Sequence, residues 1–192
     1  MILPVLKART QAQHDRVEAL IPLMADPLPP GQYAWTLARL YGLYVPLDAA
    51  LLRVRLPDSF EYGARRKLDA LHADLTALGV PPGTLPLAPA PAWSSTAHAL
   101  GALYVLEGAT LGGQLISRHL GRQLGLSAAR GAAFFASYGP DLGRMWRAFG
   151  AALEAHVAAH GGHEDVVRGA EQTFGAFEAW LSAPPRALER PA

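Results

Sequence analysis

Apolar residues recur along this chain at the spacing of amphipathic helices, and clusters of proline and glycine separate the helical segments. Between Leu3 and Ile21 the apolar stripe spans about 60° of a helical wheel, which predicts a first helix. A second stripe runs from Gln32 to about Leu56, and Pro46 within it is expected to kink the helix. The run DPLPPG between the two stripes predicts a turn.

Further helices are expected at 61–78, from Ser94 or Ser95 to about Leu124, and at 127–137, 140–160 and 164–182. The Ser-Ser-Thr run provides N-cap hydroxyls for the long helix, and a Gly-Gly pair ends the helix over 140–160. The proline-rich segment 80–92 predicts an extended surface loop. No stretch alternates apolar and polar residues as a strand does, and no repeat is visible. The sequence predicts a single all-α domain over residues 1–182, followed by a frayed tail at 183–192.

Composition excludes several classes of protein. Of 192 residues 51% are hydrophobic and 17% are charged, and the net charge is +1, so neither disorder nor a nucleic-acid partner is expected. The absence of cysteine excludes disulfides, a catalytic thiol and thiolate-bound metals. No stretch reaches the roughly 18 unbroken apolar residues of a membrane helix, and the N-terminus turns polar too soon for a secretory signal. We expect a soluble cytoplasmic protein without a membrane partner.

His14 is the first candidate for chemistry, because it lies at the edge of the apolar stripe of the first helix. Lys7 precedes it by two helical turns, and Glu18 follows it by one turn. One interpretation is a half-buried histidine that hydrogen-bonds to Glu18. The other is a metal or haem ligand whose second ring nitrogen is oriented by Glu18.

Three glycines interrupt the long apolar helix, at Gly108, Gly112 and Gly113. Each costs about 0.8–1 kcal/mol relative to alanine, so another interaction must offset the loss. Close packing of a neighbouring helix against small residues is one explanation. The other is that Gly108 and Gly112, one turn apart on one face, let a flat ligand approach the backbone.

A histidine cluster near the end of the chain comprises His156, His160 and His163, with Glu164 beside it. The spacing of the first two would suit zinc. Their place at a helix C-terminus favours solvated histidines instead, because the helix dipole attracts them there.

Six segments, in order along the chain, resemble the haem oxygenase family. LKARTQAQHDRVE around His14 is similar to the proximal-helix motif, and YVLEGATLGGQLI at 104–116 to the distal helix with its Gly-xxx-Gly-Gly pattern. The other four are YAWTLARLYGLYVPLD at 33–48, FFASYG at 134–139, MWRAFGAALEA at 145–155 and AEQTFGAFEAWL at 170–181. The similarity is greatest to the bacterial type that accompanies bacteriophytochromes.

This resemblance implies a multi-helix fold in which haem is clamped between a proximal helix and a kinked distal helix. His14 would be the axial ligand of the haem iron, with Glu18 orienting its second nitrogen. Gly108 and Gly112 would border the pocket for O₂.

The resemblance also implies residues that bind the haem propionates. Lys7 and Arg147 match the family's propionate-binding lysine and arginine, and Arg144 would assist from one turn away. The family's distal-helix tyrosine corresponds to Leu103, so the adjacent Tyr104 is the candidate here.

The implied activity is cleavage of haem to biliverdin, CO and Fe²⁺, dependent on O₂ and a reductant. Haem would be both substrate and cofactor. The implied partners are an external electron donor such as a ferredoxin or a reductase, and a bacteriophytochrome that receives biliverdin.

One position departs from the family pattern. Many haem oxygenases carry an aspartate directly after the first distal glycine, where it anchors a water network, but this chain has Ala109. Two alternatives therefore stay open: a haem-binding or haem-transfer protein without turnover, and a non-haem relative of the thiaminase or diiron type. The diiron type is disfavoured, because paired Glu-x-x-His motifs are absent from the sequence.

Overall fold

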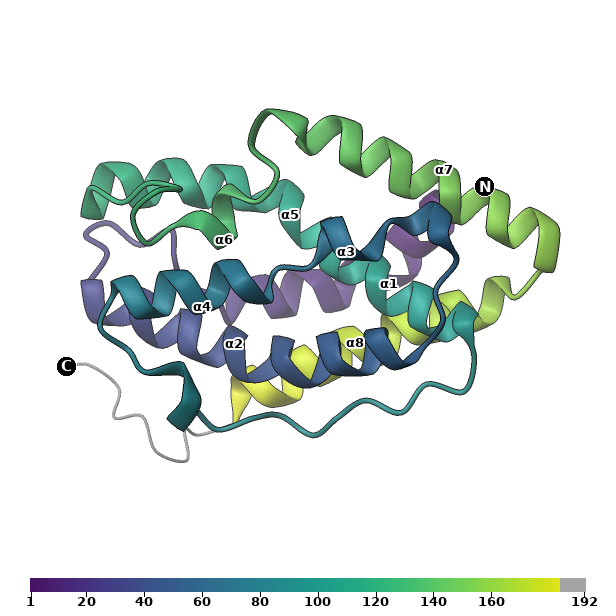
Figure 1. Cartoon of the computed structure of the whole chain (residues 1–192), viewed down its shortest axis with the longest axis horizontal. Coiled ribbons are helices and arrows are strands. Elements are labelled where there is room, and N and C mark those ends of the chain that lie inside the picture. The colour runs from purple at the N-terminus through teal and green to yellow at the C-terminus, as the bar shows by residue number, and fades with distance from the viewer. Residues whose placement is uncertain (184–192) are drawn as a thin grey trace.

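The longest described helix, α5 (Thr96–Leu124), crosses the middle of the molecule and bends part-way along its length (Figure 1). The computed structural model describes residues 1–183, and within that range it contains helices and no β-strand. The other elements are α1 (Ile2–Ala19), α2 (Pro30–Arg53), η1 (Asp58–Phe60), α3 (Tyr62–Arg65), α4 (Leu68–Ala77), η2 (Pro82–Thr84), α6 (Ala133–Ala136), η3 (Gly139–Asp141), α7 (Leu142–His160) and α8 (His163–Ser182). The all-α prediction is confirmed.

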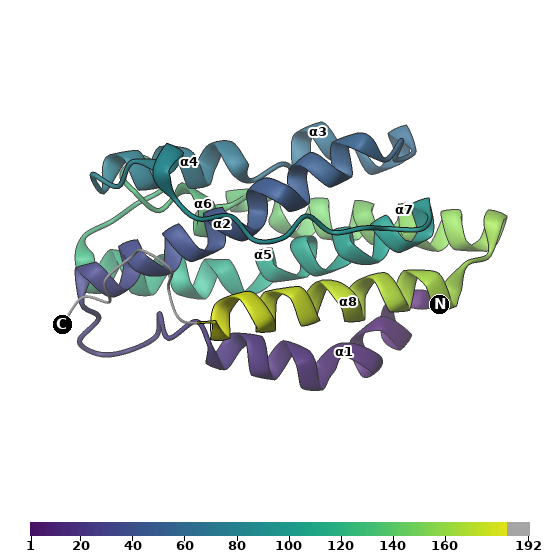
Figure 2. The ribbon, with the colours of Figure 1, turned by 90° about the horizontal axis from the view of Figure 1, so that it is seen from below.

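Helix α8 lies between α1 and α5 and packs against both (Figure 2). Two glycines allow the backbones of α5 and α8 to touch. A Cβ atom on Gly101 would collide with the carbonyl oxygen of Val166, and one on Gly169 would collide with that of His98. Because α1 packs on another side of α8, the shared helix sets how α1 and α5 face each other.

The ends of α5 follow the capping signals in the sequence. The side chain of Ser95 accepts a hydrogen bond of 3.2 Å from the backbone N–H of His98. Gly125 ends the helix with a φ of +65°, which glycine adopts without steric cost. Pro46 lies inside α2, and the helix continues through it to Arg53.

Two predicted helices are wrong in extent. The helix expected over 61–78 is divided between α3 and α4, where Arg66 is extended with a ψ of 137°. The cause is tertiary: the Arg65 side chain is buried against Glu107, while Arg66 binds Asp48 through two hydrogen bonds of 2.9 and 2.8 Å.

The helix expected over 127–137 is reduced to α6. A tight turn precedes it, in which Ser127 and Arg130 bond through their backbones and Gly131 has a φ of +76°. The predicted extended loop over 80–92 is present, apart from the single turn η2. Ala88 in this loop donates a backbone hydrogen bond of 2.9 Å to Gly42 of α2.

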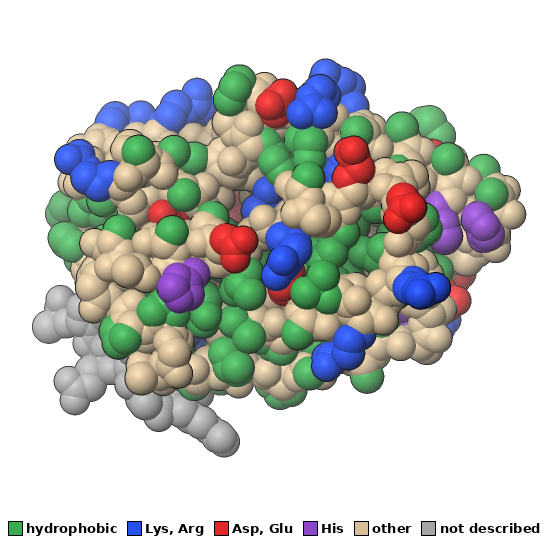
Figure 3. Space-filling view, in the orientation of Figure 1, with side chains coloured by type: hydrophobic (Ala, Val, Ile, Leu, Met, Phe, Trp, Pro, Cys, Tyr) green, Lys and Arg blue, Asp and Glu red, His purple; other side chains and the backbone are tan. Residues whose placement is uncertain are grey.

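The surface carries charges of both signs. On the face seen in Figure 3, basic and acidic side chains are interspersed rather than gathered into one basic field. Among the described helices, α5 alone is long and apolar enough to cross a membrane by length and composition, but 56% of its most apolar stretch is buried inside the fold. The frayed tail was predicted for 183–192, and residues 184–192 lie outside the described range.

Candidate active site

Two contacts join the first part of the chain to one face of α5. The Thr10 hydroxyl of α1 influences the pKa of the Tyr104 phenol, so these two groups lie close together. His119 Nε2 pairs with the carbonyl oxygen of Ala25, after α1, at 2.8 Å. On α5, Tyr104 and His119 are about 60° apart around the helix and about 22 Å apart along it. We call the stretch between these two contacts the α1–α5 interval.

The face of α5 inside this interval is bare. A Cβ atom on Gly108 or Gly112 would meet no other atom within 4 Å, so neither glycine serves helix packing. Leu111 and Leu115, on the same face, are exposed by 45% and 52%. Gly113 differs, because its Cβ would lie 2.8 Å from the carbonyl oxygen of Phe135. The three glycines therefore have different surroundings: Gly113 is packed, and Gly108 and Gly112 border open space.

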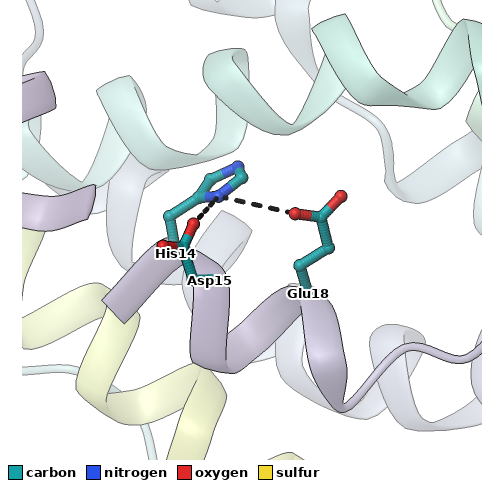
Figure 4. Close-up of side chains that lie close together, drawn as sticks. All are labelled: His14, Asp15 and Glu18. Atoms are coloured by element: carbon teal, nitrogen blue, oxygen red, sulfur yellow. Dashed lines mark ion pairs between the residues drawn. The ribbon is translucent and has the colours of Figure 1, made fainter. Parts of the chain in front are cut away.

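His14 lies inside the interval, one helical turn after Thr10. Its ring rises from α1 on the side where α5 passes (Figure 4), and its side chain is 52% exposed. Nδ1 lies 3.5 Å from Oδ1 of Asp15 and 3.8 Å from Oε2 of Glu18. Phe174 of α8 backs the ring at a centroid distance of 6.2 Å. With Nδ1 beside the carboxylates, Nε2 is the nitrogen left for an external ligand.

The same three side chains form a group whose ligand atoms lie within 4.8 Å of one another. In the described part of the chain, no other group of three histidine or acidic ligand atoms converges in this way. The late histidine cluster does not: the rings of His156 and His160 stack at 4.6 Å, and His160 Nδ1 bonds to the carbonyl oxygen of His156. This agrees with the interpretation of that cluster as solvated histidines.

Free cations lie at the Tyr104 end of the interval. Leu3 of α1 packs beside Gly150 of α7, and the two helices are antiparallel, so Lys7 and Arg147 lie at a similar level. Both are exposed, and neither forms an ion pair within residues 1–183. Arg144, by contrast, is bound to Asp141 at 3.1 Å.

Other basic residues of α1, unlike Lys7, form ion pairs. Arg9 binds Glu171 at 3.1 Å, and Arg16 binds Glu178 at 2.8 Å, so both are engaged with α8. Lys7 points to another side of α1, and no residue of α8 that the structure describes pairs with it. On the helical wheel it lies about 20° from His14, on the face directed to the interval.

Tyr104 supplies a neutral polar group near these cations. Burial raises the pKa of its phenol, and the neighbouring Thr10 hydroxyl opposes the rise. Its ring contacts Trp146, which adjoins Arg147, at a centroid distance of 6.1 Å.

Taken together, the interval offers one imidazole nitrogen, a bare helix face opposite it, and unpaired cations at one end. A planar ligand with a metal centre and acidic substituents fits these groups. Haem has both features, and its iron accepts a histidine as a proximal ligand.

Comparison with known proteins agrees with this geometry. A family model described as "Heme oxygenase" matches residues 89–183. A heme oxygenase of Xanthomonas campestris pv. campestris is 38% identical over 123 residues, which are 64% of this chain and 71% of that protein. The chain belongs to the haem (heme) oxygenase family. It is an enzyme of the haem-degrading class, and its family implies that it binds haem.

Solved structures of haem oxygenases share the fold. The enzyme of Neisseria meningitidis, solved with NO and CO bound, has a TM-score of 0.78 at 25% identity, covering 100% of this chain and 96% of that one. The enzyme of Leptospira interrogans has a TM-score of 0.75 at 20% identity, covering 94% of this chain and 98% of its own. At this identity, the similarity to the Leptospira enzyme shows a shared fold only.

One group near the haem oxygenase site is not predicted from the sequence. Glu107, directly before Gly108, is 1% exposed and pairs with Arg65 at 2.5 Å. Its other oxygen accepts a hydrogen bond of 2.6 Å from Tyr138. A glutamate inside the apolar run LYVLEGATL indicates that its side chain is buried beside a polar partner. The sequence does not indicate that this partner is Arg65. Ala109, where many relatives have an aspartate, is exposed.

Proposed function

We propose that this protein cleaves haem to biliverdin, CO and Fe²⁺, using O₂ and electrons from an external donor of the ferredoxin or reductase class. The observation that supports this most is the bare face of α5, because Gly108 and Gly112 border open space on the side of His14. A glycine pair kept for packing would instead contact a neighbour, as Gly113 does.

His14 would hold the haem iron through Nε2. Asp15 and Glu18 lie near Nδ1 and would hold its proton, which fixes the ring orientation and makes the other nitrogen a better donor. When bound, haem supplies the iron centre at which O₂ is activated. The histidine is a neutral ligand, unlike the thiolate that favours O–O cleavage in other haem enzymes.

Lys7 and Arg147 are the proposed partners of the haem propionates, with Tyr104 nearby. Neither has an acidic partner within residues 1–183, so both are available for an anion. Arg144 is proposed only in an assisting role, because Asp141 already neutralises it.

Proton supply would rest on water rather than on a side chain at position 109. Ala109 has no titratable group, and both it and Gly112 are open to solvent. The resemblance to phytochrome-associated enzymes extends the proposal to a bacteriophytochrome as the recipient of biliverdin.

The test is turnover of the haem-loaded protein. With ascorbate or a ferredoxin and its reductase, the Soret band should decay and biliverdin absorbance should appear, together with CO. Ala109 favours one alternative, a haem-binding protein without turnover. A stable haem complex that yields no biliverdin with either reductant would support that alternative and contradict the proposal.

A further inference from the structure

Glu107 is the buried charge closest in sequence to the bare face of α5. Both of its carboxylate oxygens are engaged, one by Arg65 at 2.5 Å and one by the Tyr138 hydroxyl at 2.6 Å. The side chains of Arg65 and Glu107 are 0% and 1% exposed. The pair is thus buried away from water, and in this environment its hydrogen-bond geometry is tightly defined.

Arg65 connects this carboxylate to three other segments. It is itself part of α3, its Nε donates to the carbonyl oxygen of Phe60 in η1 at 2.5 Å, and its Nη1 donates to that of Met145 in α7 at 3.2 Å. Glu107 therefore ties α5 to a rigid group of neighbours rather than to one flexible side chain.

Helix α6 and the segment that follows it hold α5 at further points. Phe135 packs its carbonyl oxygen against Gly113, and Gln114 donates a hydrogen bond of 3.0 Å to the carbonyl oxygen of Gly139. Together with the Tyr138 bond to Glu107, these contacts lie just before and just after Gly108 and Gly112. The bare face is thus held from behind at both ends.

We propose that Glu107, fixed by Arg65 and Tyr138, is a positioning residue that sets the rotation of α5 and so the direction of its bare face toward His14. This inference rests on the proposed function. Gly108 and Gly112 have no side chains that could fix the helix against a ligand, so its rotation must be set elsewhere. A buried ion pair suits this purpose, because it contributes little net stability but tolerates only a narrow geometry.

A small rotation would matter. Turning α5 by about 20° moves its Cα atoms by about 0.8 Å, since they lie about 2.3 Å from the helix axis. A displacement of this size is enough to disturb a reaction that depends on how closely α5 approaches the haem ring. The expected consequence is loss of selectivity among the ring positions attacked.

The test compares two tyrosines that donate to a buried carboxylate. Tyr138→Phe removes the bond to Glu107 of α5. Tyr62→Phe removes the equivalent bond of 2.7 Å to Asp48 of α2, which pairs with Arg66. Hydrogen–deuterium exchange of the haem-free protein is measured first. Tyr138→Phe should lower protection of the amides at 107–113 by about tenfold or more, and Tyr62→Phe should leave them unchanged.

The second measurement is the isomer composition of the biliverdin formed by the haem-loaded protein. Tyr138→Phe should broaden it, and Tyr62→Phe should keep the wild-type composition. The double variant Arg65→Met with Glu107→Leu removes both charges without leaving either one unpaired, and should act like Tyr138→Phe but more strongly.

Unchanged exchange at 107–113 and an unchanged isomer ratio in Tyr138→Phe would overturn the inference, whether or not the double variant folds. A lower melting temperature alone, shared with Tyr62→Phe, would show a purely structural role and also overturn it. If the wild type forms no biliverdin, the proposed function fails, while the exchange comparison still decides whether Glu107 positions α5.

Discussion

Gly112 and Gly113 are neighbours in the chain but have opposite surroundings. A Cβ atom on Gly113 would lie 2.8 Å from a backbone carbonyl oxygen, whereas one on Gly112 would meet nothing within 4 Å. Helix propensity penalises both glycines equally. Only Gly113 is explained by packing, and the open space beside Gly112 is what the proposed ligand site rests on.

This difference predicts opposite effects of alanine at the two positions. Gly112→Ala should raise the free energy of unfolding of the haem-free protein by up to about 1 kcal/mol, because alanine is the better helix former and has room. Gly113→Ala should lower it by about 1–3 kcal/mol, because the new methyl group overpacks a rigid backbone contact. Melting temperatures should move by about 2–4 °C per kcal/mol.

At Gly112, a larger side chain should reduce activity without reducing stability. Gly112→Leu places a bulky side chain on the bare face, so biliverdin yield should fall sharply while the haem-free protein melts no lower than the wild type. A variant that melts well below the wild type but turns over normally would show that Gly112 serves packing, and the assignment of the bare face would be wrong.

The axial-ligand assignment predicts that His14→Ala loses the histidine–haem spectrum and nearly all turnover. Added imidazole should partly restore both, because it can occupy the space that the side chain vacates. Glu18→Gln should lower activity by about tenfold, since it weakens the hold on Nδ1. The spectrum and the rate of haem decay measure these effects.

His72, an exposed histidine on α4, provides the control, and His72→Ala should behave as the wild type. A wild-type spectrum in His14→Ala would instead move the ligand to another histidine. His119 and His98 are then the next to test, although both are buried and hydrogen-bonded.

The double variant Lys7→Ala with Arg147→Ala should bind haem more weakly than the wild type. Each substitution should reduce the affinity by less than about tenfold, since exposed charge pairs contribute roughly 0–1 kcal/mol. Biliverdin isomers should become mixed, because haem can then rotate in the site. Arg144→Ala, which removes an arginine already paired with Asp141, should change the isomers far less. A single isomer at full yield from the double variant would contradict the propionate assignment.

Lys67 is expected to titrate at an unusual pH. Burial lowers the pKa of its amine to about 8, while Glu107 favours the cation and Arg65 opposes it. Lys67 lies over the Tyr138 ring at 3.2 Å. Because lysine occurs only at positions 7 and 67, ¹³C-methylated protein gives few signals, and a Lys67→Met variant assigns the relevant one.

The same shift predicts how stability depends on pH. Between about 8 and lysine's usual 10.5, the unfolded chain holds the Lys67 proton and the folded protein does not. Stability of the wild type relative to Lys67→Met should therefore rise as pH increases through this window. A difference that stays flat, or an NMR midpoint near 10.5, would contradict the lowered pKa.

Sequence periodicity predicted the long helices well, but it did not predict the interruption of the helix between Arg65 and Leu68. Helical spacing continues through 61–78, so nothing local marks the interruption. It arises because Arg65 is drawn to Glu107 and Arg66 to Asp48, partners far away in the sequence. Likewise, the motifs marked His14, Lys7 and Arg147 as candidates, but not which cations would be left unpaired.

By itself, then, the sequence determined the helical class, the order of the helices, and the motifs that place an imidazole on one helix and glycines on another. These are local properties, because an amphipathic stripe or a cap depends on residues a few positions apart. The tertiary structure alone decided that Gly108 and Gly112 face open space while Gly113 is packed, and that Glu107 is tied to Arg65 and Tyr138. Each of these depends on residues distant in the chain, and a glycine or a glutamate has the same local signature whether a ligand, a helix or an arginine lies beside it.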